Sequence, residues 1–151
     1  MMADIRRATP DDMDALVALA YAMHDESPRF RLYRFLPDRI RTTLATLLDT
    51  RQGFVVVAEV EGVIVGGFAG MACPHFACDV LQAQDIALFV APSHRGGTLA
   101  ARLVRSFLEW SRSINAEPTI GINTGVTPER TAQLLAALGA RQSGTNWTWG
   151  I

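Results

Sequence analysis

Apolar residues follow two spacings along this chain, one typical of helices and one typical of strands. In four segments an apolar side chain returns every three or four positions, which predicts amphipathic helices. These segments are residues 9–23, 37–48, 97–113 and 127–138. Shorter runs, rich in β-branched residues and bounded by turn residues, predict strands. The strand segments are residues 5–8, 54–60, 63–71, 84–90, 119–124 and 147–151.

The order of these elements predicts one domain with a mixed sheet. Glu61-Gly62 is a tight-turn signal between two strand segments, so those strands should pair as an antiparallel hairpin. The later strand–helix–strand passages permit parallel pairs. The chain has 151 residues, close to the usual size of one domain, and contains no linker or internal repeat. The expected fold class is therefore α/β (α+β), in a single domain over residues 1–151.

Composition narrows the expected partners and compartment. The formal net charge is -1, with acids and bases interspersed, so we expect no nucleic acid partner. The apolar runs are far shorter than the ~20 residues of a membrane span, and the acidic start is unlike a signal peptide. Two cysteines make no disulfide framework, so we expect a cytoplasmic protein. Cys73, His75 and Cys78 offer three ligands at an unfamiliar spacing, so we expect no metal.

The most informative segment is the strand-to-helix connection within residues 85–100. A small-residue turn containing Gly96 and Gly97 opens the long helix. Free amides at a helix N-terminus, backed by the helix dipole, suit a pyrophosphate, and glycines let phosphates approach the backbone. An ordinary connecting loop explains these features equally well. Neither G-x-x-x-x-G-K-S/T nor a G-x-G-x-x-G after the first strand occurs, so the common nucleotide loops fit worse.

This turn resembles motif A of the GNAT superfamily of N-acetyltransferases, whose pattern is Q/R-x-x-G-x-G/A. Arg95 matches the first position and Ala100 the last, whereas Thr98 stands where the family usually has its central glycine. The preceding residues 88–92 match the hydrophobic-x-Val-x-Pro lead-in of the family. The order of elements over nearly the whole chain matches as well.

The resemblance implies the GNAT fold, with a mixed central sheet of about six to seven strands flanked by about four helices. It implies acetyl-CoA as co-substrate and acetyl transfer to an amine of a small molecule or peptide. The strand at residues 88–90 would bulge, splay from residues 119–124 and pair with pantetheine. The implied cofactor-binding residues are Leu88, Phe89, Val90, Arg95, Gly96, Gly97, Thr98, Leu99 and Ala100.

Two carboxylates are candidates for the catalytic base. Glu26 lies in residues 24–28, which should break the first helix and which resemble a His-x-Glu-Ser-Pro segment of some bacterial and phage family members. A capping loop is an equal alternative for this segment. Asp85 is the carboxylate of the motif strand, and we weigh a solvated acid there about twice as heavily as a catalytic one. We predict that Glu26→Gln lowers kcat/KM more than Asp85→Asn does.

The usual acid of the family is missing, which keeps a second function open. Many members place a tyrosine four residues before the glycine that closes the last helix, and this chain has Leu135 there, before Gly139. His75 and His94 are further candidates for proton transfer. The alternative function is a catalytically weak or inactive acyl-CoA-binding module that acts as a sensor or subunit. A homodimer stays open for either function.

Overall fold

The computed structural model describes residues 2–150 of the chain. Within that range the chain forms one five-stranded mixed sheet and four α-helices. The strands are β1 (Asp4–Arg7), β2 (Gly53–Val60), β3 (Val63–Pro74), β4 (Leu81–Val90) and β5 (Ala116–Thr119). The helices are α1 (Met13–Glu26), α2 (Pro37–Leu48), α3 (Leu99–Ser113) and α4 (Pro128–Ala137). Three short 3₁₀ helices are η1 (Pro10–Asp12), η2 (Phe30–Leu32) and η3 (Pro92–His94).

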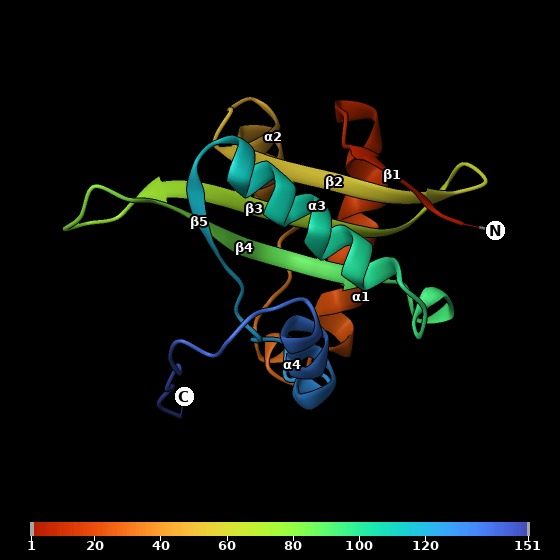
Figure 1. The fold of residues 1–151 in the computed structure, drawn as a ribbon. Coiled ribbons are helices and arrows are strands. Elements are labelled where there is room, and N and C mark those ends of the chain that lie inside the picture. The colour runs from red at the N-terminus through yellow and green to blue at the C-terminus, as the bar shows by residue number, and fades with distance from the viewer. Residues whose placement is uncertain (1, 151) are drawn as a thin grey trace.

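The strands lie in the spatial order β1-β2-β3-β4-β5. The first three neighbouring pairs are antiparallel, and β4 and β5 are parallel. Helix α3 crosses one face of the sheet, while α1 and α2 cover the other face (Figure 1). Helix α4 lies below β4 in this view (Figure 1). The parallel pair therefore lies at one side of the sheet, next to α4.

Two hydrophobic cores hold these layers together. Between the sheet and α3, the rings of Phe68 and Phe107 stack with centroids 4.6 Å apart, and Phe54 meets both edge-on. On the other face, Leu16 of α1 and Leu44 of α2 are buried against the strands. Because close-packed cores resist deformation, the aromatic core holds α3 and its N-terminus at a fixed place beside β4.

A cluster of charged side chains fixes the beginning of α1. The Arg6 guanidinium donates to both Asp12 oxygens, at 2.8 and 2.9 Å, and to Glu59, at 2.7 and 3.1 Å. The Thr9 N–H also donates to Asp12, at 2.8 Å. The hydrogen bonds from Arg6, with that from Thr9, hold the pKa of Asp12 well below its ordinary range. The helix start expected near Thr9 is present, as η1 leading into α1.

One predicted strand is displaced and one is absent, so the sheet has five strands rather than six to seven. Strand β5 ends at Thr119, and residues 120–124 leave the sheet although their β-branched side chains favour a strand. Residues 147–150 are not a strand either, and Trp147 and Trp149 are 80% and 85% exposed. Ile151, the last residue of that predicted strand, lies outside the described residues. The segment pairs with none of the strands within residues 2–150, and an alternating pattern alone does not stabilise a strand.

Two helix boundaries also differ from the predicted ones. Helix α1 continues to Glu26, so this residue ends the helix instead of belonging to the break after it. Ser27 is extended because Pro28 follows it and disfavours the helical conformation. Helix α3 begins at Leu99 rather than at Gly97. None of the helices within residues 2–150 is both long enough and apolar enough to cross a membrane.

Candidate functional site

Strands β4 and β5 pair at one end and part at the other. Parallel pairing joins residues 81–84 to residues 116–119 and stops there. The next contact involves a side chain, because the Gly121 N–H donates to Asp85 Oδ1 at 2.8 Å. On the opposite edge of β4 the register with β3 skips Ile86, which forms a β-bulge. After this point the two chain segments diverge, and a cleft opens between them.

The cleft extends from Asp85 to the turn before α3 and has a volume of about 440 Å³. Most of the cofactor-binding residues implied by the family resemblance line it. They are Leu88, Phe89, Val90, Arg95, Gly96, Gly97 and Ala100. The side chain of Thr98 is exposed outside the lining, and that of Leu99 is buried in the core. Thr98 and Leu99 therefore belong to the turn without lining the cleft.

The turn before α3 is shaped to accept an anion. Gly96 has a φ of +90°, a conformation that glycine adopts freely and other residues rarely do. Within residues 2–150, no atom lies within 4 Å of the place where a side chain would start on Gly97, so a ligand can approach the backbone. The first hydrogen bond of α3 runs from the Arg102 N–H to the Thr98 carbonyl, at 3.0 Å. The earlier amides therefore lack an intrahelical acceptor and, with the helix dipole, suit a pyrophosphate.

Arg130, in the first turn of α4, is a residue that the sequence analysis missed. Its Nη2 atom lies 3.8 Å from the place where a Cβ would stand on Gly96, and the residue lines the cleft. Within residues 2–150 it forms no ion pair. A cation in the first turn of a helix interacts unfavourably with the helix dipole, so its presence there points to a role other than stabilising the helix. The unfavourable position of Arg130 after Thr127-Pro128 can be recognised from the sequence, and it could have identified Arg130 as a candidate ligand-binding residue.

The protein itself holds the side chain of Arg95. Its two terminal nitrogens bind both carboxylate oxygens of Glu26, at 2.5 and 2.6 Å, and its Nε donates to the Val90 carbonyl at 2.7 Å. The guanidinium carbon lies 5.1 Å from the centre of the Phe89 ring. The hydrogen bonds from Arg95 hold the pKa of Glu26 below its ordinary value. Arg95 therefore shapes the turn, and Glu26 is a poor proton acceptor.

The end of α1 joins the two walls of the cleft. Glu26 binds Arg95 on the β4 side. The adjacent Ser27 is fully buried and donates from its hydroxyl to the Thr124 carbonyl on the β5 side, while accepting from the Phe30 N–H at 3.1 Å. We call Glu26 and Ser27 the α1 clasp, because they connect segments that are far apart in the sequence. Through Ser27 the clasp holds the chain after β5 at the place where it has left the sheet.

Asp85 has a different environment from Glu26. It is half-buried, accepts the hydrogen bond from Gly121, and has no ion-pair partner within residues 2–150. Burial raises the pKa of Asp85 above its ordinary value, although the hydrogen bond from Gly121 opposes the shift. A carboxylate with a raised pKa inside a cleft is suited to accept a proton from a bound amine.

Few groups in the cleft can protonate a leaving thiolate. Leu135, at the position of the family tyrosine, packs against the main core, and Leu134 lines the cleft beside it. Among the lining residues that the structure describes, there is no tyrosine and no cysteine. His94 lines the cofactor end, where its Nδ1 lies 2.9 Å from the Ser93 hydroxyl. His75 lies in the connection between β3 and β4 and is not part of the lining.

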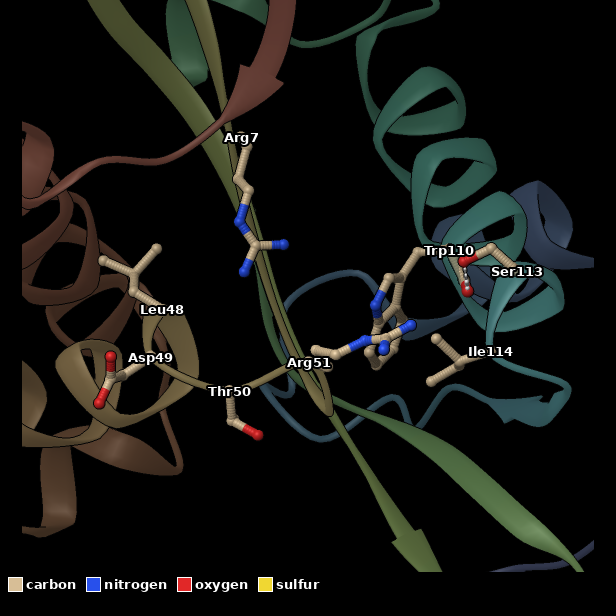
Figure 2. Close-up of a pocket in the computed structure, with 8 residues that line it drawn as sticks. All are labelled: Arg7, Leu48, Asp49, Thr50, Arg51, Trp110, Ser113 and Ile114. Carbon is tan, nitrogen blue, oxygen red and sulfur yellow. Dashed lines mark hydrogen bonds between the residues drawn. The ribbon is translucent and has the colours of Figure 1, made fainter.

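A second hollow lies apart from this cleft (Figure 2). Residues of β1, of the connection between α2 and β2, and of α3 line it, including Arg7, Arg51 and Trp110. Both hollows have a volume of about 440 Å³, so size does not distinguish them. The hollow in Figure 2 shares no residue with the cleft and contains none of the predicted site residues. Arg51 is therefore a suitable remote control position.

Comparisons with known proteins identify the family and the fold. The model of the acetyltransferase (GNAT) family matches residues 18–140. No curated protein matches the chain. One similar solved structure is an aminoglycoside acetyltransferase from an uncultured soil metagenomic sample, with 21% identity and a TM-score of 0.75 over 100% of this chain and 99% of that one.

Two further solved structures share the fold at similar distances in sequence. AAC(6')-Iy in complex with the bisubstrate analog CoA-S-monomethyl-acetylneamine has 16% identity and a TM-score of 0.79, over 100% of this chain and 99% of that one. A ribosomal-protein-alanine N-acetyltransferase from Brucella melitensis biovar Abortus 2308 has 18% identity and a TM-score of 0.73, over 100% of both chains. At these identities the similarity establishes the fold alone.

Proposed function

Because the chain belongs to the acetyltransferase (GNAT) family, we propose that it is an acetyl-CoA-dependent N-acetyltransferase acting on an amine of a small molecule or peptide. One observation carries this proposal: a single cleft connects the anion-binding turn at Gly96 and Gly97 with the carboxylate of Asp85. At about 3.3 Å per strand residue, roughly 16 Å of β4 separates Val90 from Asp85. That length suits an extended pantetheine arm, with phosphates at the turn and the thioester near the carboxylate.

The residues of the cleft fit acetyl-CoA. The free amides at the start of α3 and the guanidinium of Arg130 supply positive charge for the phosphates. Among the described residues, none pairs as a strand with the β5 side of β4 between Asp85 and Val90, so this backbone is available to the pantetheine amides. When bound, acetyl-CoA supplies the activated acetyl thioester. The CoA-based analog in one similar structure supports this choice of donor.

We assign Asp85 as the base, which reverses the ranking that the sequence suggested. Asp85 takes one proton from the acceptor ammonium, directly or through a water molecule. The freed nitrogen attacks the thioester carbonyl carbon, so a C–N bond forms and the C–S bond breaks. The second proton leaves the nitrogen and reaches the departing thiolate through solvent. Glu26 is already bonded to Arg95, so we assign it as a positioning residue.

A second candidate function is an acyl-CoA-binding module with weak or no catalysis, acting as a sensor or subunit. The absence of tyrosine and cysteine among the described lining residues favours it. A thiolate leaves more readily than an alkoxide, however, because its pKa is lower. The missing acid therefore limits the rate of transfer without preventing it.

Two assays separate these functions. Acetyl-CoA should raise the Tm, because a ligand that binds the folded state stabilises it by linkage. Both functions predict this rise, and its absence at millimolar acetyl-CoA would contradict both. CoA release should then be measured across a panel of amines. Release above the amine-free background supports the transferase, whereas a Tm rise without release for any amine supports the binding module.

Action in the cytoplasm is part of this proposal. Cys73 and Cys78 are both unpaired, which suits a reducing compartment. The homodimer and the absence of a nucleic acid partner stay predictions from the sequence.

A further inference from the structure

The charges inside the cleft indicate which amines fit it, provided that the proposed transferase function holds. The ionisable side chains that line the cleft are Glu26, Asp85, His94, Arg95 and Arg130. Glu26 and Arg95 neutralise each other, and their side chains are only 29% and 32% exposed. His94 and Arg130 lie at the cofactor end, beside the turn before α3. Within residues 2–150, Asp85 is therefore the carboxylate of the lining that is left to meet a cationic amine.

Asp85 has capacity for one ammonium group. Its Oδ1 accepts the hydrogen bond from Gly121, which leaves Oδ2 for a ligand. An ammonium group that leaves water without an anionic partner is strongly disfavoured. A substrate with several ammonium groups would satisfy one of them at Asp85 and leave the others unpaired in the cleft.

Most of the uncharged side chains that line the cleft are apolar, with Asn123, Thr124, Thr127 and Thr131 among the polar ones. Ile86 follows Asp85 directly and is 45% exposed. Ile122 lies three residues after the end of β5 at Thr119. Met23 of α1 and Phe30 of η2 also line the cleft. These side chains present hydrocarbon rather than hydrogen-bonding groups to a ligand. They suit an amine with an apolar body better than a sugar, whose hydroxyl groups would find few partners among them.

The segment that contributes Phe30 to the cleft lining is basic, and we call it the basic rim. The connection between α1 and α2, residues 27–36, contains Arg29, Arg31 and Arg34 and no acidic residue. None of these three arginines forms an ion pair within the described chain. Arg29 reaches across to the carbonyl of Asn123, a residue of the cleft lining, at 3.5 Å. The positive charge of the rim repels polycations before they enter the cleft. The repulsion is weaker for an amine with one positive charge.

We propose that the acceptor is a small amine with a single ammonium group on an apolar body, of the arylalkylamine type, and that polycationic amines are excluded. The ammonium binds Asp85 and the body packs against Ile86, Phe30 and the other apolar walls. This substrate class differs from the aminoglycosides named for a structurally similar protein. The exclusion has two sources, the single free carboxylate and the basic rim.

The test compares kcat/KM for 2-phenylethylamine, spermidine and kanamycin at saturating acetyl-CoA and constant ionic strength. The wild-type protein should prefer 2-phenylethylamine by at least about tenfold over either polycation. Arg29→Glu should narrow the preference over spermidine by at least about threefold, because it reverses a charge at the rim. Arg51→Glu, in the remote hollow of Figure 2, makes the same change in net charge and should leave the ratio unchanged.

Other results would overturn the substrate class, the role of the basic rim or the transferase function. A higher kcat/KM for spermidine or kanamycin would overturn the substrate class and leave the transferase function in place. Equal effects of Arg29→Glu and Arg51→Glu would overturn the role of the rim. If other amines of the panel release CoA but none of these three is acetylated, the substrate class is overturned and the transferase function stands. If no amine of the panel releases CoA, the transferase function is refuted and this inference falls with it.

Discussion

Asp85 and Glu26 line the same cleft and carry the same kind of charged group, yet their surroundings act on them in opposite directions. Burial beside Gly121 raises the pKa of Asp85. The forked hydrogen bonds from Arg95 lower the pKa of Glu26. A candidate base is therefore identified by what surrounds the carboxylate. A carboxylate that burial destabilises can accept a proton, whereas one bound to an arginine holds that arginine in place.

The largest expected effect comes from Asp85→Asn. Loss of a general base typically lowers the rate by two to four orders of magnitude, and we expect kcat/KM to fall by roughly that factor. The substitution keeps the size of the side chain, and it removes a charge that burial disfavours, so the Tm at neutral pH should not fall. The affinity for acetyl-CoA is the control and should stay near the wild-type value. Near-normal kcat/KM in this variant would remove Asp85 from the mechanism.

The next effect tests the cofactor end of the cleft. Gly97→Asp puts a side chain and a negative charge where the phosphates should approach, so the Kd for acetyl-CoA should rise at least about tenfold, or ~1.4 kcal/mol. Gly144→Asp is a matched control, because Gly144 also has open space around it but does not line the cleft. Equal affinities of the two folded variants for acetyl-CoA would place the phosphates elsewhere.

A smaller effect is expected from Glu26→Gln. The amide can keep one hydrogen bond to Arg95, so the α1 clasp loosens without losing its shape, and kcat/KM should fall by less than about tenfold. Glu26→Ala removes both hydrogen bonds and should lower kcat/KM and the Tm further. This graded response distinguishes a positioning residue from a base. A fall in Glu26→Gln as large as that in Asp85→Asn would restore Glu26 as the base.

The smallest expected effect is that of Arg130→Gln. Arg130 is exposed, and ion pairs of exposed groups are weak, so the Kd for acetyl-CoA should rise by about two- to fivefold. The difference from wild type should shrink as salt is added, because salt screens exposed charges. Arg51→Gln serves as the control for net charge. An effect that does not change with salt would contradict a direct electrostatic role for Arg130.

Much of the fold could be predicted because hydrophobic spacing reports burial. The periodic segments correspond to the four helices and to strands β1 to β4, with boundaries displaced by a few residues. The turn before α3 could be predicted as well, because its pattern and its glycines are contiguous in the chain. Gly96 does need the positive φ that glycine favours.

The errors arise where partners are distant in the chain. Residues 120–124 have strand-forming side chains, but the buried hydroxyl of Ser27 binds the carbonyl of Thr124, and no pattern in the sequence announces that contact. Glu26 and Arg95 lie 69 positions apart and meet only when α1 and the turn before α3 pack together. Both candidate carboxylates line the cleft, but their surroundings could not be predicted, because the contact of Glu26 with Arg95 and the burial of Asp85 depend on residues distant in the chain.

The most direct test of the account is the pH profile of kcat/KM for the wild type, Glu26→Gln and Asp85→Asn with 2-phenylethylamine. Asp85 accepts a proton only when ionised, so activity should rise with pH through its pKa, which burial raises from its ordinary value. We predict this acidic limb in the wild type and in Glu26→Gln, and its loss in Asp85→Asn. An acidic limb that persists in Asp85→Asn and disappears in Glu26→Gln would contradict the account.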